Sequence, residues 1–322
     1  MMQTEIGVIA HNEAGNLAAL LTGLMAEPGG HRVCIVSSGS TDATDDIALD
    51  WAKQHDRIRA IIEPERRGKA RAINRFLHEL RADTECVVLI SGDVLPEAGT
   101  LGKLLEPLQS NEACMTGARP CPDNPKRGLI GLIVHFQWDL LDHIARKRPK
   151  LGEMVAFRTP VRPIDPESVV DEAALEAQLT ADGGSLAYVP SARVRNRGPG
   201  TWSYLIAQRE RICIGHKRLQ ARTGYRVTTQ RLVDLAGPAL GFLIRHPGQF
   251  PVAVAAAGVE VWARLRARRS QELPSVWPML QSTRIQGHTS LKAPSSAQAA
   301  PVLPPASTHP FRVAAADRAG NP

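Results

Sequence analysis

The first 120 residues alternate short apolar runs with longer amphipathic segments, and this alternation constrains the fold more than any other feature of the chain. Such a pattern is typical of a mostly parallel sheet whose faces are covered by helices. We therefore expect an α/β fold, with helices following the first three strands. The predicted strands are 6–10, 33–36, 58–62, 87–90 and 114–118, and the predicted helices are 14–26, 42–54 and 68–80.

The second half of the chain continues with a helical pattern at 130–145, a short apolar run at 154–157, an acidic segment at 171–179 and a long helical pattern from Thr201. A chain of 322 residues suffices for one large α/β domain with appendages. We expect that domain to cover residues 1–235.

Residues 236–270 contain two apolar stretches, and neither reaches the roughly 20 residues that a membrane-spanning helix needs. Two interpretations remain open. The stretches are ordinary buried or surface helices, or they form a membrane-associating anchor in which Arg264, Arg266, Arg268 and Arg269 face anionic headgroups. The Pro- and Ser-rich segment 271–322 is predicted to be a disordered tail.

The formal net charge of +7 indicates a basic surface, but aromatic residues make up only 4% of the chain. Without aromatic side chains among the basic clusters, stacking on nucleic acid is not expected, and anionic lipid or a sugar diphosphate is the better partner. Five cysteines at these spacings fit neither a zinc site nor a disulfide framework. We expect a cytoplasmic protein, peripheral on the inner face of the cell membrane.

Polar loops follow three of the predicted strands. They are His11-Asn12-Glu13, the segment Ser37 to Asp42, and Ser91-Gly92-Asp93. In open α/β sheets, ligands bind beyond the carboxyl ends of the strands, so these three loops should border one crevice. Each loop by itself also fits a helix cap or a plain turn.

Taken together and in this order, the loops resemble those of the family 2 glycosyltransferases. The resemblance extends over about residues 5–220. It includes Arg67-Gly68-Lys69, a Ser91-Gly92-Asp93 segment similar to an Asp-x-Asp motif, Asp171-Glu172 with Leu175, and Gln208-Arg209-Glu210-Arg211. This family implies a GT-A fold, a Rossmann-like nucleotide-diphospho-sugar transferase domain followed here by C-terminal helices, and sugar transfer with inversion.

The resemblance also implies a role for each matching residue. Asp93 would hold a divalent cation, Mg²⁺ or Mn²⁺, which bridges to the donor phosphates. Glu172 would act as the base that activates the acceptor hydroxyl, with Asp171 as the alternative. The residues expected to bind the nucleotide-sugar donor are His11, Asn12, Glu13, Ser38, Asp42, Lys69, Gln208 and Arg211.

Two positions depart from the family pattern, namely Ser91 in place of the first aspartate and Ile212 in place of a tryptophan. They motivate one alternative, a catalytically silent binding or scaffold protein at the membrane. A nucleotidyltransferase is a second alternative, although the chain lacks its Gly-rich opening loop. A UDP-sugar is the favoured donor, and glycan, lipid and small-molecule acceptors all remain open.

Overall fold

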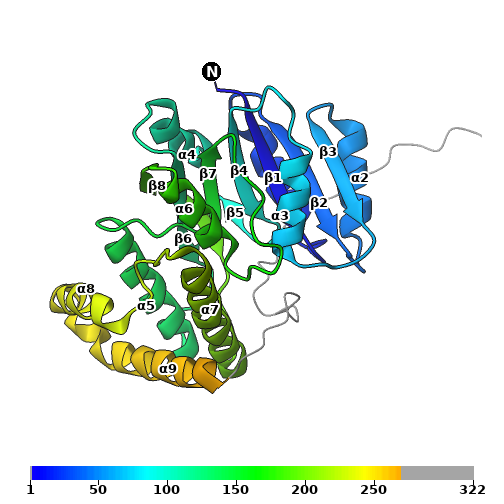
Figure 1. Cartoon of the computed structure of the whole chain (residues 1–322). Helices are drawn as coiled ribbons and strands as arrows, with labels where there is room; N and C mark the ends of the chain where they lie inside the picture. Colours follow the sequence, from blue (N-terminus) through cyan, green and yellow to red (C-terminus); the bar gives the residue numbers. More distant parts are fainter. Residues whose placement is uncertain (1, 270–322) are drawn as a thin grey trace, which may run out of the picture. The chain divides into compact units, whose positions relative to one another are not determined.

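The computed structural model describes residues 2–269 as a sheet with helices on both faces, followed by C-terminal helices (Figure 1). The predicted tail at 271–322 lies outside the described residues. The strands are β1 (Thr4–Ala10), β2 (Arg32–Ser38), β3 (Ile58–Glu63), β4 (Cys86–Ser91), β5 (Leu95–Pro96), β6 (Met115–Pro122), β7 (Met154–Arg158) and β8 (Leu186–Asn196).

The helices include every helical segment that the sequence predicts. They are α1 (Leu17–Ala26), α2 (Thr44–Gln54), α3 (Lys69–His78), α4 (Thr100–Gln109), α5 (Gly128–Ala145), α6 (Asp171–Ala181), α7 (Trp202–Thr223), α8 (Leu232–Arg245) and α9 (Phe250–Arg269), with a short 3₁₀ turn η1 (Pro247–Gln249). Helix α4 and the strands β5 and β8 were not expected. The predicted boundary at residue 235 falls within α8.

The strand order in the described part of the chain is β3-β2-β1-β4-β7-β6-β8-β5. Strands β3, β2, β1 and β4 are mutually parallel, as predicted, and β6 is parallel to β8. Strand β7, however, runs antiparallel to both β4 and β6. The second half of the sheet is therefore mixed, which hydrophobic periodicity cannot reveal because it carries no information on strand direction.

Helical spacing of the apolar residues explains how the helices attach to the sheet. Helix α1 buries Leu17, Leu20, Leu21 and Leu24, which lie on one side of the helix. Helix α3 packs on β1 where Gly7 has no side chain, because a Cβ atom there would lie 2.6 Å from the Phe76 ring. This close approach fixes the height at which Lys69, the first residue of α3, stands above the sheet.

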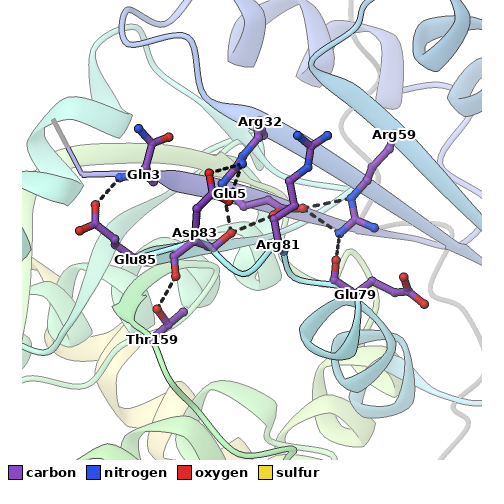
Figure 2. A network of polar contacts seen from close by, with 10 residues as sticks. Gln3, Glu5, Arg32, Arg59, Glu79, Arg81, Asp83, Glu85 and Thr159 are labelled. Atoms are coloured by element: carbon purple, nitrogen blue, oxygen red, sulfur yellow. Dashed lines mark hydrogen bonds and ion pairs between the residues drawn. The ribbon is translucent and has the colours of Figure 1, made fainter.

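The amino end of the parallel sheet is held by charged side chains (Figure 2). Glu5 on β1 is fully buried, and its Oε1 accepts hydrogen bonds from Arg59 at 2.7 and 3.1 Å. Thr84 donates to its other carboxylate oxygen at 3.2 Å, and Arg32 binds Asp83 at 2.8 Å. A buried carboxylate that is paired in this way has a structural role.

Helix α9 packs against α7 and α5 through apolar contacts and through ion pairs. Glu260 binds Arg209 of α7 at 2.8 Å and Arg264 of its own helix at 2.7 Å, while Arg266 binds Glu210 at 3.0 Å. Two of the four arginines that the sequence assigned to lipid headgroups thus pair with carboxylates of the chain. No helix among residues 2–269 is long and apolar enough to cross a membrane.

Candidate active site

The carboxyl ends of β1 and β4 lie side by side at the point where the order of strands reverses. From β1 the chain continues to β2 and β3 on one side, and β4 then returns to the other side of β1. Ligands of open α/β sheets bind at such a point. The loop His11-Asn12-Glu13 follows β1 and Asp93 follows β4, so both predicted loops lie at this place.

Hydrogen bonds join the first two predicted loops to each other. His11 Nδ1 lies 2.7 Å from the backbone oxygen of Ser38, and the side-chain oxygen of Asn12 accepts from Thr41 N at 2.6 Å. Asp42 accepts from the backbone N–H of Ala14 at 3.2 Å. Ser38 is almost fully buried. These side chains tie the loops after β1 and β2 together, a role the sequence did not reveal.

Lys69 contacts the acidic pair, Asp171 and Glu172, although Lys69 and Glu172 are 103 positions apart in the sequence. Lys69 Nζ lies 2.7 Å from Glu172 Oε1 and 4.0 Å from Asp171 Oδ2, both in the first turn of α6. Burial disfavours the charged lysine, but the two carboxylates outweigh that effect and raise the pKa of Lys69. The predicted diphosphate-binding lysine thus contacts the predicted base.

The two members of the acidic pair have different environments. Glu172 is partly exposed, and although burial opposes its charge, the ion pair with Lys69 holds its pKa well below the usual range. Asp171 is only 5% exposed, and its Oδ1 has no hydrogen-bond partner among the described residues. Burial, reinforced by the charge of Glu172, raises the pKa of Asp171. Environments that separate two neighbouring carboxyl groups in this way are typical of catalytic sites.

Asp93 lies in the same group of side chains. Burial raises its pKa, and the charges of Lys69, Glu172 and Arg211 all act on it. Arg211 also acts on Asp171. Gln208 precedes Arg211 by one turn on α7 and is partly buried. The structure therefore brings Lys69, Asp93, the acidic pair and Arg211 together.

Two further residues belong to this candidate site, and no sequence motif indicated either of them. Asn16 is buried, and its side chain donates to the backbone oxygen of Gly92 at 2.5 Å, which ties the loop after β1 to the loop after β4. Glu153 stands directly before β7, and burial together with the charges of Asp93 and Glu172 raises its pKa to about 7. Nothing in the sequence indicated that Glu153 belongs to the site, because that depends on which strand pairs with β7.

The oxygen-rich set of side chains fits a hard divalent cation, which prefers carboxylate and phosphate oxygens. The relevant groups are Asp93, Glu153 and the hydroxyl of Ser91. Within residues 2–269, no group of three or more His, Cys, Asp or Glu side chains is arranged to hold a metal ion alone. Oxygens of a bound diphosphate would therefore complete the coordination, as is usual for Mg²⁺.

A cavity of about 350 Å³ lies between the loop 162–170, α6 and α7. Its wall includes Val170, Ala174 and Gln178, and none of the predicted site residues lines it. A smaller cavity does belong to the site, because Lys69, Ser91, Glu153 and Glu172 line it together with apolar residues.

Comparisons with known proteins bear on the family and the fold. Residues 5–157 match the profile of Glycosyl transferase family 2. The fold is similar to that of a mannosyltransferase from Pyrobaculum calidifontis, solved in complex with GDP-Man and Mn²⁺. The TM-score is 0.54 and the identity 22%, over 85% of this chain and 77% of that chain.

A second structure, residues 1–349 of TarS from S. aureus, matches over 83% of each chain with a TM-score of 0.49 and 14% identity. No curated protein is significantly similar to the sequence. The family match favours sugar transfer over nucleotidyl transfer. We conclude that residues 5–157 form a family 2 glycosyltransferase domain and that the chain, with its GT-A fold, is a glycosyltransferase.

Proposed function

We propose that the enzyme transfers a sugar from a nucleoside-diphosphate donor to a hydroxyl acceptor in a single displacement with inversion. One observation carries this proposal, namely that Lys69, Asp93 and Glu172 reach the carboxyl end of the sheet from three different elements. A lysine and an adjacent carboxylate that could hold a cation suit a diphosphate, while Glu172 supplies a base.

Donor binding and base activation are linked through Lys69. In the structure Lys69 holds the carboxylate of Glu172 at 2.7 Å, which makes that carboxylate a weak base. A diphosphate that attracts the Lys69 ammonium group would weaken this ion pair and raise the basicity of Glu172. Glu172 is then strongest as a base when a donor is bound, and it does not deprotonate an acceptor while the donor site is empty.

In the transfer step, Glu172 accepts the proton of the acceptor hydroxyl while that oxygen bonds to the anomeric carbon. The bond from this carbon to the diphosphate oxygen breaks on the opposite face. Lys69 and Arg211 stabilise the departing diphosphate, with Gln208 beside them on α7. Mg²⁺ or Mn²⁺ held by Asp93 would neutralise further charge on that leaving group.

The nucleoside would lie in the pocket that His11, Asn12, Glu13, Ser38 and Asp42 shape. UDP-sugars are the first donors to test. GDP-mannose is the second, since the structurally similar mannosyltransferase was solved with it.

The first experiment measures thermal stabilisation by UDP, GDP and dTDP, each with and without Mn²⁺, because ligands of the native state raise the melting temperature. We expect a metal-dependent shift with one diphosphate. Asp93→Asn should abolish the metal dependence. Glu172→Gln should retain the shift but lower kcat by about 10²–10⁴-fold, and NMR of the product would give its anomeric configuration. Absence of any shift with all three diphosphates would contradict the proposed nucleoside-diphosphate donor.

We also propose that the C-terminal helices dock on an anionic membrane surface. Helices α8 and α9 expose large apolar side chains, and Arg245, Arg268 and Arg269 lie on the same helices. The side chains are Val233, Leu240, Ile244, Phe250, Val254, Val261, Trp262 and Leu265, each 45–74% exposed.

Cosedimentation with vesicles tests this docking. Binding to phosphatidylglycerol vesicles, weakened by Ile244→Ser and Phe250→Ser but not by Leu49→Ser on α2, is the expected result. Leu49 is a suitable control because it is also exposed, at 41%. Equal binding of all variants, or none by the wild type, would contradict the proposal.

A further inference from the structure

The pairing of β4 with β7 places an acid beside the loop that carries Asp93. The two strands are antiparallel, and the last paired residues are Ile90 and Met154. The pairing ends there, and Ser91 and Glu153 are the next residues of the two segments. Both residues line the same cavity, together with Lys69 and Glu172. Glu153 therefore stands across from the position that precedes Gly92-Asp93.

The side chains around this cavity carry an excess of negative charge, which favours binding of a cation. Glu172 is neutralised by Lys69 at 2.7 Å. Neither Asp93 nor Glu153 forms an ion pair with a basic side chain of residues 2–269, and both are partly exposed and so open to a ligand. Near them, the acids Asp93, Glu153, Asp171 and Glu172 outnumber the bases Lys69, Lys150 and Arg211.

The backbone at Glu153 adds a second feature. Its φ is 63°, in the left-handed region, where a residue with a Cβ atom costs about 1–2 kcal/mol and glycine costs almost nothing. Non-glycine residues held in this conformation cluster at functional sites. A glycine variant at position 153 would therefore remove the carboxylate without harming the fold, which is useful for the experiment below.

We propose that Glu153 supplies the second protein carboxylate to the divalent cation that Asp93 holds, in place of an acid at position 91. The inference rests on the metal-assisted transfer proposed above. A cation bound by one or two carboxylates and otherwise by substrate phosphates is the usual form of a Mg²⁺ or Mn²⁺ site in phosphate chemistry. Strand β7 thus contributes what the Ser91-Gly92-Asp93 loop lacks.

The test measures Mn²⁺ binding by electron paramagnetic resonance on the full chain, with saturating UDP or GDP and no acceptor. We expect Glu153→Gln to weaken Mn²⁺ binding by at least about tenfold, as Asp93→Asn does. Glu106→Gln is the matched control, since Glu106 is exposed on α4 and its loss should leave Mn²⁺ binding unchanged. Circular dichroism verifies that each variant is folded.

Two further variants separate loss of the ligand from loss of the fold. Glu153→Gly should be at least as stable as the wild type and yet bind Mn²⁺ weakly. The double variant Ser91→Asp with Glu153→Gln returns a carboxylate to the opposite strand, and it should regain Mn²⁺ affinity.

The possible failures are distinguishable. Wild-type affinity in Glu153→Gln, with loss in Asp93→Asn, would overturn the role of Glu153 and leave the proposed function intact. No Mn²⁺ binding by the wild type with either diphosphate would overturn both.

Discussion

Acidification should destabilise the protein through His216, which lies on α7 and is only 7% exposed. Burial lowers the pKa of His216 to about 3 from its ordinary 6.5, and the charges of Lys150, Arg209 and Arg264 act in the same direction. The folded state therefore binds this proton less readily than the unfolded state does. Stability from neutral His216 is complete above pH 6.5 and is lost as the pH falls from 6.5 towards 3.

The size of the effect follows from the same values. Each pH unit below 6.5 costs about 1.4 kcal/mol of the free energy of unfolding until the folded pKa is reached. At about pH 5 the loss is therefore about 2 kcal/mol. His216→Gln removes this titration, so the wild type should lose about 2 kcal/mol more than the variant between about pH 8 and pH 5.

Urea unfolding followed by circular dichroism at both pH values measures this difference. A constant cost of the substitution cancels, because each protein is compared with itself. His78→Gln is the control, since the His78 side chain is 81% exposed. If the wild type and His216→Gln lost equal stability on acidification, our description of His216 as a buried neutral side chain among cations would be refuted.

Three further predictions concern the site and its support. Gly39→Ala should lower diphosphate affinity, measured by calorimetry, by about tenfold and stability by about 1–3 kcal/mol. Gly39 has a φ of 60° and a Cβ atom there would collide with the Arg66 backbone, whereas Gly102→Ala, with open space around it, should not lower stability. As the pH rises, Asp171→Asn should become more stable relative to the wild type, measured as the free energy of unfolding in urea. The pKa of Asp171 is raised in the folded state, so its ionisation opposes folding of the wild type. An advantage that is independent of pH would contradict this. Gly7→Ala should cost about 1–3 kcal/mol by pressing on Phe76, and an unchanged melting temperature would show that α3 can move.

Much of the fold could be predicted because its signals are local. The buried strands β1, β2 and β4 contain continuous apolar runs, and α1 repeats leucines at helical spacing. Loops at strand ends marked the place of the site, and the spacing of the motifs indicated the family. Helix α4 was not predicted because Gly102 and Pro107 interrupt its helical pattern.

The roles within the site were less predictable. Lys69 and Glu172 are 103 positions apart, so their ion pair of 2.7 Å depends on how α3 and α6 approach the sheet. Likewise, the sequence gives Asn12 and Asp42 as donor-binding residues, while the structure also engages both in bonds between the two loops. A motif identifies which residues gather at a site, but hydrogen bonds decide what each one does there.

The sequence by itself determined the strand and helix order, the polar loops and the resemblance to family 2 glycosyltransferases, because each of these depends on neighbouring residues. Only the tertiary structure decided that β7 runs antiparallel beside β4 and brings Glu153 next to Ser91. It also decided that Arg264 and Arg266 pair with Glu260 and Glu210. Strand direction and long-range ion pairing arise from how the elements pack, and local periodicity carries no record of either.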